Sequence, residues 1–344
     1  MKLRTLLTCC MLAALASGCA TTWNMRTEVS PAPIAWSDSG GHIRIRHLMT
    51  VRGFAEGGVT ASNVLRYALF GRSRDADLVR PVAVAMDREG RLAIADTGCR
   101  CVHLYLPAEK RYVKLVTAGE RPFLSPVSVA FDAESRMFIS DSAGGFISLF
   151  DRDGVFLSFL TTAASTERSR PTGLAYLAGT GTLYGVDTRS HEIVALAADG
   201  NHLFSFGSRG AEAGKFNFPT HIAVAQDGKI YVTDAMNFRI QVFDRSGSLL
   251  ASFGKHGNGS GDLSMPKGVA VDSSGVIYVV DALFDNVQLF NLKGEFLFTL
   301  GGRGAAPGEF WLPSGALIDG KDRLYVCDTY NQRVQIFQIE VGER

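Results

Sequence analysis

The chain has 344 residues, with 35 lysines and arginines against 34 aspartates and glutamates. Its formal net charge of +1 gives no electrostatic basis for binding nucleic acid, and its 46% hydrophobic content excludes intrinsic disorder. Glycine (37 residues) and phenylalanine (22) are abundant, while proline (11) is scarce. This composition favours many short strands joined by tight turns over long helices.

The N-terminus has the pattern of an export signal. Lys2 and Arg4 give a positive start, and an apolar run follows over residues 6–16. The run is too short to span a bilayer, which takes ~20 residues. We therefore predict a secretory signal peptide.

The end of the apolar run resembles the lipobox of bacterial lipoproteins. It reads Leu-Ala-Ser-Gly-Cys over residues 15–19, although Ala16 stands where those proteins usually have Leu, Val or Ile. The resemblance implies that residues 1–18 are removed and that Cys19 is lipidated. Because Ala20 is not an aspartate, it also implies the outer membrane of the cell envelope. An ordinary signal peptide that is cleaved near Ala20 is the alternative.

Residues 19–42 are predicted to form the lipidated cysteine and a flexible tether. The segment is polar and contains Pro31 and Pro33, and no apolar period appears in it. Trp23 and Trp36 fall within this tether. The sequence leaves open whether these two side chains lie at the lipid interface or dock onto the body of the protein.

A pair of short apolar strands recurs six times through the rest of the chain. The first strand of each copy begins at Pro81, Pro126, Pro171, Pro219, Pro266 or Pro313. The second strand of each copy ends at Asp96, Asp141, Asp187, Asp234, Asp281 or Asp328. These aspartates lie 45 to 47 residues apart, with room for a third and a fourth strand. Four short strands in a unit of this length are typical of one blade of a β-propeller.

We therefore predict an all-β chain that forms a six-bladed β-propeller of four-stranded antiparallel blades over residues 43–340. The last repeat stops after its third strand, and residues 43–51 are strand-like but have no blade of their own. We expect this N-terminal strand to close the last blade as its missing outer strand, which would hide an open edge. A ring closed in this way is expected to be monomeric.

The spacers between blades carry a family signature. Residues 206–219, 253–266 and 300–313 each run from an outer strand through a glycine-rich stretch to the next proline, and the turns at Asp234 and Asp328 read Asp-x-x-Asn-x-Arg. These features resemble NHL repeats, most closely in the last three blades. The glycines permit positive φ where one blade crosses to the next. Each aspartate is expected to cap its own turn.

Three cysteines remain beyond the lipid site. In an oxidising compartment, one disulfide among Cys99, Cys101 and Cys327 is expected. We predict that Cys99 or Cys101 pairs with Cys327, because the repeat places them in adjacent units. We interpret the Cys-x-Cys pair as having no histidine nearby and therefore as weak evidence for a metal site, with buried free thiols as the alternative.

One face of the ring is predicted to carry the binding surface. The turn after each second strand and the spacer between blades should emerge on the same face, where basic and aromatic side chains gather. This mixture fits an interface with a protein or a polyanion, and the alternative is that the aromatic rings tuck between blades while the cations are solvated. The predicted binding face consists of Arg209, Met236, Phe238, Lys255, His256, Lys267, Phe284, Arg303, Trp311 and Tyr330, and Leu283 is expected on the same side.

Thr220 and His221 are predicted to line the mouth of the central channel. We favour His221 as a filled channel position over His221 as a ligand. Residues 61–70 interrupt the repeats with an apolar stripe at helical spacing. The surrounding residues 55–77 are expected either to cover the mouth of the channel or to pack against the ring near the first blade in a purely structural role.

Catalytic, metal and cofactor sites are not predicted, because carboxylates and histidines do not converge at the starts of the inner strands. We predict a lipid-anchored envelope protein that binds partner proteins through one loop face. A metal-dependent lactonase or lyase and a ligand-sensing propeller are the alternatives. The identity of the partner and the leaflet that the protein faces lie beyond the sequence.

Overall fold

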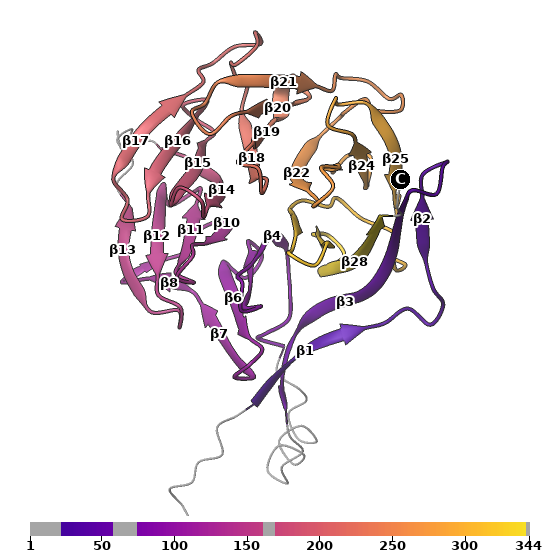
Figure 1. Cartoon of the computed structure of the whole chain (residues 1–344). Coiled ribbons are helices and arrows are strands. Elements are labelled where there is room, and N and C mark those ends of the chain that lie inside the picture. Colours follow the sequence, from indigo (N-terminus) through magenta and orange to yellow (C-terminus); the bar gives the residue numbers. More distant parts are fainter. Residues whose placement is uncertain (1–21, 58–73, 161–168, 342–344) are drawn as a thin grey trace, which may run out of the picture.

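The computed structural model is a ring of six β-sheets around a central axis (Figure 1). It describes residues 22–57, 74–160 and 169–341. The predicted all-β, six-bladed propeller is confirmed. The predicted signal peptide, the lipid site Cys19 and the helical stripe at 61–70 lie outside the described residues.

The first three blades each consist of four consecutive antiparallel strands, ordered from the axis to the rim. Blade 1 contains β4 (Pro81–Met86), β5 (Leu92–Asp96), β6 (Cys101–Leu106) and β7 (Arg111–Leu115). A small hairpin of β8 (Thr117–Ala118) and β9 (Arg121–Pro122) follows it. Blade 2 contains β10 (Pro126–Phe131), β11 (Met137–Asp141), β12 (Phe146–Phe150) and β13 (Phe156–Leu160). Blade 3 contains β14 (Pro171–Leu177), β15 (Thr182–Asp187), β16 (Glu192–Ala197) and β17 (His202–Phe206).

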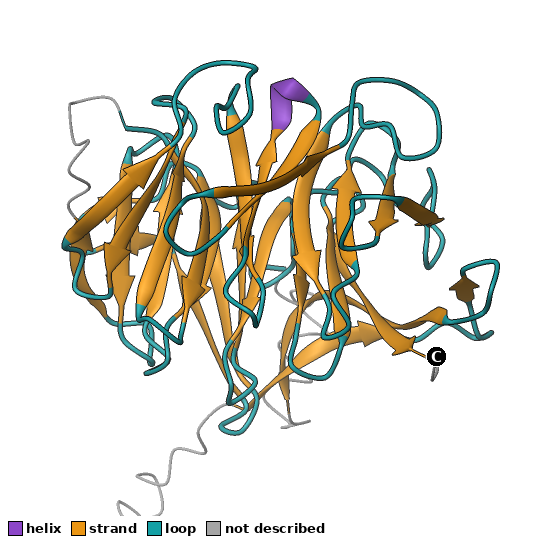
Figure 2. Cartoon of the chain, turned by 45° about the horizontal axis from the view of Figure 1, so that its top comes forward, coloured by secondary structure: helices purple, strands orange, loops and turns teal. Residues whose placement is uncertain are grey.

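Blades 4 and 5 repeat this plan. Blade 4 contains β18 (Pro219–Val224), β19 (Ile230–Asp234), β20 (Arg239–Phe243) and β21 (Leu249–Phe253), with the short 3-10 helix η1 (Ala235–Asn237) in its second turn. Blade 5 contains β22 (Pro266–Val271), β23 (Ile277–Asp281), β24 (Asn286–Phe290) and β25 (Phe296–Leu300). Figure 2 shows η1 and the long spacer loops on the same, upper side of the ring.

Blade 6 joins the two ends of the described chain. It contains β26 (Ala316–Ile318), β27 (Arg323–Asp328), β28 (Arg333–Val341) and β3 (Ile43–Gly57). β3 pairs antiparallel with β28, from Ile43 opposite Val341 to Val51 opposite Val334. The predicted closure by residues 43–51 is therefore confirmed. Ile45 and Val51 are fully buried, so the closing strand contributes to the core as well as to the sheet.

The predicted tether is wrong over much of its length. β1 (Thr22–Glu28) and β2 (Ala35–Ser37) both pair antiparallel with β3, so they cover its outer edge. The Trp23 ring packs 4.8 Å from that of Tyr112, and the Trp36 ring packs 5.9 Å from that of Phe337. Both tryptophans therefore dock onto the body. Burying these rings and pairing an exposed edge outweigh the polar composition that indicated a tether.

The core lies between neighbouring blades. The second strands β5, β11, β15, β19 and β23 are buried along their whole length, because each is covered on both faces by the adjacent sheets. Tyr184, Tyr231 and Tyr278 occupy matching positions in these strands and are among the largest fully buried side chains. Strands that are apolar on both sides are what a closed ring of blades requires.

The glycine-rich spacers have the predicted backbone role. Gly207, Gly254 and Gly301 follow the outer strands and have φ of +91°, +92° and +78°. A Cβ at Gly207 would lie 2.4 Å from Cε2 of Phe216, and one at Gly301 would lie 2.4 Å from Cε2 of Phe310. The glycine therefore lets the spacer fold over a buried phenylalanine. Within the described residues, no helix has the length and apolar character needed to cross a bilayer.

Candidate functional site

The aspartates at the ends of the second strands organise one face of the ring. Asp281 accepts hydrogen bonds from the N–H groups of Leu283 and Phe284 in its own turn, at 3.1 and 3.3 Å. It also accepts them from Ser264 and Met265, just before the next inner strand, at 2.7 and 3.0 Å. The predicted capping role is confirmed. The same carboxylate ties the turn to the end of the spacer, so both emerge on one side, which we call the loop face (Figure 2).

The residues of the predicted binding face lie on this side but differ in exposure. Met236, Trp311 and Tyr330 are 54%, 45% and 44% exposed, and the rings of Trp311 and Tyr330 pack against each other at 5.6 Å. Phe238 is half-buried against His256, with 4.3 Å between the ring centroids. The side chains of Arg209, Lys255, His256 and Arg303 are exposed, and those of Lys267 and Phe284 are half-buried.

Further exposed apolar side chains on the loop face were not predicted. They stand just before the inner strands, one or two positions ahead of the proline that begins each strand. Together with the predicted residues they form a broken circle that we call the apolar ring. The apolar ring consists of Val79, Leu124, Phe218, Met236, Met265, Leu283, Trp311 and Tyr330, each at least 40% exposed. The position ahead of the proline varies in chemistry from blade to blade, so a single sequence does not mark it as a surface.

Cationic side chains stand at the mouth of the channel, inside the apolar ring. Thr220 and His221 begin the inner strand β18, as predicted, and His221 Nδ1 lies 3.0 Å from Thr220 Oγ1. Burial, with nearby Lys267, lowers the pKa of His221 to about 3, so the imidazole is neutral at physiological pH. Burial and the charge of Arg170 lower the pKa of Lys267. Lys267 and Arg170 therefore place two basic side chains near the loop-face end of the channel.

The side chains that line the channel are mostly apolar. A cavity of about 200 Å³ lies along it and is lined by the inner strands of all six blades. Among its lining residues are Met86, Phe131 and Ile318, while Tyr176 brings a hydroxyl group. The lining residues that the structure describes include no carboxylate and no imidazole.

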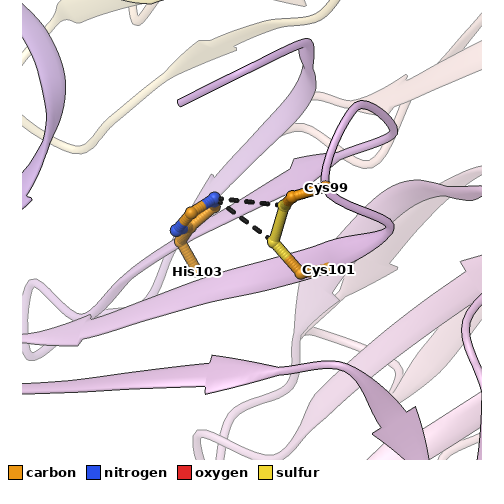
Figure 3. Close-up of side chains that lie close together, drawn as sticks. All are labelled: Cys99, Cys101 and His103. Carbon is orange, nitrogen blue, oxygen red and sulfur yellow. Dashed lines mark hydrogen bonds between the residues drawn. A yellow bond between two sulfur atoms is a disulfide. The ribbon is translucent and has the colours of Figure 1, made fainter. Parts of the chain in front are cut away.

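The predicted disulfide to Cys327 is wrong. Cys99 pairs with Cys101, and Cys327 is a free, fully buried thiol. The Cys327 side chain sits in the core between blades 6 and 1, where burial raises its pKa. His103 lies beside the disulfide, with Nε2 3.6 Å from Cys99 Sγ and 3.3 Å from Cys101 Sγ (Figure 3). The prediction that no histidine lies near the Cys-x-Cys pair is therefore wrong, because His103 follows Cys101 by two residues on the same face of β6.

Two family models match parts of the chain. Residues 216–243 match the NHL repeat, and residues 270–343 match a family described as a 6-bladed beta-propeller. The chain is a six-bladed β-propeller with NHL repeat sequence. The match begins in blade 4, where the sequence resemblance is close. A comparison with curated proteins gave no match.

Solved structures share the propeller fold at low sequence identity. A gluconolactonase from Xanthomonas campestris is 16% identical, with a TM-score of 0.61, over 92% of this chain and 98% of its own. Virginiamycin B lyase from Staphylococcus aureus is 14% identical, with a TM-score of 0.57, over 77% of this chain and 86% of its own. An auxiliary nutrient binding protein from Bacteroides thetaiotaomicron is 14% identical, with a TM-score of 0.58, over 76% of this chain and 70% of its own. Enzymes and a binding protein share the fold, so the fold does not choose between those functions.

Proposed function

We propose that this propeller is a lipid-anchored protein of the cell envelope that binds a partner protein through its loop face. The observation that carries the proposal is the apolar ring around a cationic channel mouth. Half of the large hydrophobic side chains that are exposed on the described surface belong to this ring. Monomeric proteins rarely gather exposed apolar side chains on one face unless that face binds something.

The chemistry of the loop face resembles the core of a protein interface. Aromatic residues, methionine and arginine are enriched in such cores, and lysine, glutamate and aspartate are depleted. Met236, Met265, Trp311 and Tyr330 belong to the apolar ring, and the guanidinium of Arg80 lies over the Tyr330 ring at 5.6 Å. The carboxylate of Asp262 on this side pairs with Lys255 at 3.6 Å. We therefore expect the partner to present apolar side chains together with carboxylates.

The position of β1 supports an orientation in which the loop face points away from the membrane. The N–H of Trp23 donates to the carbonyl of Lys110 at 2.6 Å, and Lys110 belongs to the turn between β6 and β7. That turn lies at the opposite end of the blade from the loop face. Since Cys19 precedes Trp23 by four residues, a lipid on Cys19 would hold the far side of the ring at the membrane. The loop face would then point away from the bilayer.

The anchor is tested by Cys19→Ala in the full chain. Two or more acyl chains give stable membrane binding, and their loss removes the anchor. We expect the wild-type protein to sediment with membranes and to incorporate a labelled fatty acid, and the variant to do neither. Equal labelling of the variant would contradict lipidation at Cys19.

The binding face is tested with matched surface substitutions. Met236→Ser, Leu283→Ser and Trp311→Ser remove apolar side chains from the loop face. Leu203→Ser and Leu250→Ser remove side chains of similar exposure, 50% and 52%, from the outer strands. Cross-linked partner recovered with the intact protein should fall at least tenfold for the face variants and stay unchanged for the rim variants. Equal recovery from both sets would contradict the proposed face.

The enzyme alternative has its own test. The structural neighbours include a lactonase and a lyase, so the full chain should be assayed for lactone hydrolysis with and without Ca²⁺. The binding proposal predicts no turnover that depends on His221 or Lys267 at the channel mouth. Turnover that disappears in His221→Ala and Lys267→Ala would instead favour an enzymatic function at the channel mouth.

A further inference from the structure

In blades 4 and 6, side chains from four positions of the repeat converge on one point behind the loop face. In blade 4, Asn237 Nδ2, Arg239 Nε and Gln241 Nε2 all donate to Asp234 Oδ2, at 2.9, 2.7 and 3.2 Å. Blade 6 repeats this arrangement with Asn, Arg and Gln around Asp328, at 2.9, 2.6 and 3.1 Å. The spacing Asp-x-x-Asn-x-Arg-x-Gln therefore brings four side chains together.

Blade 1 fills the same four positions with residues that ligate metals. Its sequence reads Asp96-x-x-Cys99-x-Cys101-x-His103. The strand register is the same, because Asp96 pairs with Cys101 as Asp234 pairs with Arg239. In the described residues, blade 1 alone carries cysteine or histidine at these three positions. The repeat thus supplies a converging geometry, and blade 1 supplies metal-ligating side chains where blades 4 and 6 have Asn, Arg and Gln, while Asp96 keeps its backbone hydrogen bonds to Val79 and Arg80.

The distances from His103 to the two sulfurs fit a small tetrahedral site, while the sulfurs themselves are bonded to each other and would have to separate on reduction. Nε2 of His103 lies 3.6 Å from Cys99 Sγ and 3.3 Å from Cys101 Sγ (Figure 3). A zinc ion with Zn–S of about 2.3 Å and Zn–N of about 2.0 Å at tetrahedral angles requires S···N separations of about 3.5 Å. Asp96 Oδ2 lies 3.8 Å from the same Nε2. The ligand atoms of Cys99, Cys101 and His103 lie within 4.8 Å of one another.

The surroundings of His103 hold its ring in place for ligation. Nδ1 of His103 lies 2.8 Å from the Tyr112 hydroxyl, which leaves Nε2 facing the sulfurs. The Tyr112 ring packs between Phe54 and Trp23, at 4.8 Å from each ring. A hydrogen-bonded partner on the second ring nitrogen is the usual support of a metal-binding histidine. The Tyr112 hydroxyl would play this part.

We propose that, when the Cys99–Cys101 disulfide is reduced, this site binds one Zn²⁺ through Cys99, Cys101 and His103, with Asp96 as the fourth ligand. Two thiolates and an imidazole select a thiophilic ion such as Zn²⁺ over Ca²⁺ or Mg²⁺. The bonded sulfurs of the disulfide cannot both act as thiolate ligands. Oxidised and metal-bound forms therefore exclude each other.

The chemical steps balance with a dithiol reductant. The dithiol passes two electrons and two protons to the disulfide, so the S–S bond breaks, two thiols form, and the reductant becomes a disulfide itself. Zn²⁺ then binds as the two thiol protons leave to solvent. Entry is from the loop face, because Cys99 is half-buried while Cys101, His103 and Asp96 are fully buried.

Zinc binding by the full chain tests the proposal. The purified protein is reduced, freed of reductant without oxygen and titrated with Zn²⁺, and Co²⁺ gives a second readout through its thiolate charge-transfer band. We expect one equivalent of Zn²⁺ in the reduced protein and none in the oxidised protein. Cys99→Ser, Cys101→Ser and His103→Gln should each abolish the charge-transfer band or weaken zinc binding at least 100-fold. Tyr112→Phe should weaken it about 10- to 100-fold.

Cys327→Ala is the matched control, because it removes a buried thiol that lies outside the site. It should bind one equivalent with the wild-type affinity. Circular dichroism checks that each variant is folded. Cys99 is half-buried, so Cys99→Ser can still be titrated with zinc if Cys101→Ser or His103→Gln fails to fold. Absence of zinc from the reduced wild-type protein, or unchanged binding by folded Cys99→Ser, would overturn the proposal.

Discussion

The buried pair of Asp328 and Arg333 shows how single residues hold the loop face together. Arg333 is 1% exposed, and its Nε donates to Asp328 Oδ2 at 2.6 Å. Its other nitrogens donate to the carbonyls of Ala305, Ala306 and Glu309 at 2.8 to 2.9 Å. One guanidinium therefore fixes the spacer between blades 5 and 6.

We predict that Arg333→Met destabilises the protein by about 3–5 kcal/mol, because it leaves the Asp328 carboxylate buried without its partner. Arg239→Met removes the equivalent cation in blade 4, where the Arg239 side chain is 14% exposed instead of 2%. That variant should lower the free energy of unfolding by less, because the partly exposed Arg239 is partly hydrated and its ion pair with Asp234 is therefore weaker. Chemical denaturation measures both, and an equal loss would show that burial does not set the cost.

The channel-mouth histidine predicts a pH dependence of stability. The pKa of His221 is lowered in the folded protein from 6.5 to about 3. Below pH 6.5 the His221 imidazole takes up a proton in the unfolded chain but stays neutral in the folded protein. The free energy of unfolding therefore decreases as pH falls from 6.5 towards 3. Relative to His221→Gln, the wild type should lose ~2 kcal/mol of unfolding free energy between pH 8 and pH 5. If the free energies of unfolding of the two proteins change in parallel between pH 8 and pH 5, the lowered pKa of His221 would be contradicted.

At the scale of single elements, β3 is the strand on which closure depends. Ile45 is fully buried between blades 5 and 6, opposite Ile339 of β28, while the adjacent Arg44 is exposed. We predict that Ile45→Ala lowers the free energy of unfolding by about 2–5 kcal/mol. Arg44→Ala should change it by less than about 0.5 kcal/mol. Equal effects in denaturant unfolding would show that β3 adds no core to the ring.

The repeat made the blades and the closure predictable from sequence. A proline, an aspartate and apolar strands recur at nearly constant spacing, and residues 43–51 have a strand pattern but belong to none of the six repeats. β1 and β2 were missed because their residues are polar and punctuated by prolines. Their pairing depends on the edge that β3 exposes, which exists only in the folded ring.

The site was only partly predictable for similar reasons. The capping aspartates and the loop face followed from the repeat, and so did the channel-mouth position of His221. The Cys99–Cys101 pair was predicted incorrectly because adjacency of blades was taken to bring Cys327 within reach. Comparing the turns Asp234-x-x-Asn237 and Asp96-x-x-Cys99 would have shown that Cys99, Cys101 and His103 converge, since the repeat fixes where those positions point.

For the whole molecule, closure makes the ring a rigid support with two different ends. Every blade contributes its second turn and its spacer to the loop face, so exposed apolar side chains from five of the six blades, with blade 3 the exception, surround one mouth. Trp23 and the β6–β7 turn lie at the other end. A lipid on Cys19 would therefore leave the loop face free for a partner.

The most direct test of this account is site-specific photo-cross-linking in intact cells. A photoreactive amino acid is placed in the full-length protein at Met236 or Leu283 on the loop face, and at Leu203 or Leu250 on the rim. We predict discrete adducts with a partner protein from the loop-face positions and none from the rim. Adducts from the rim positions alone would contradict the loop face as the binding surface.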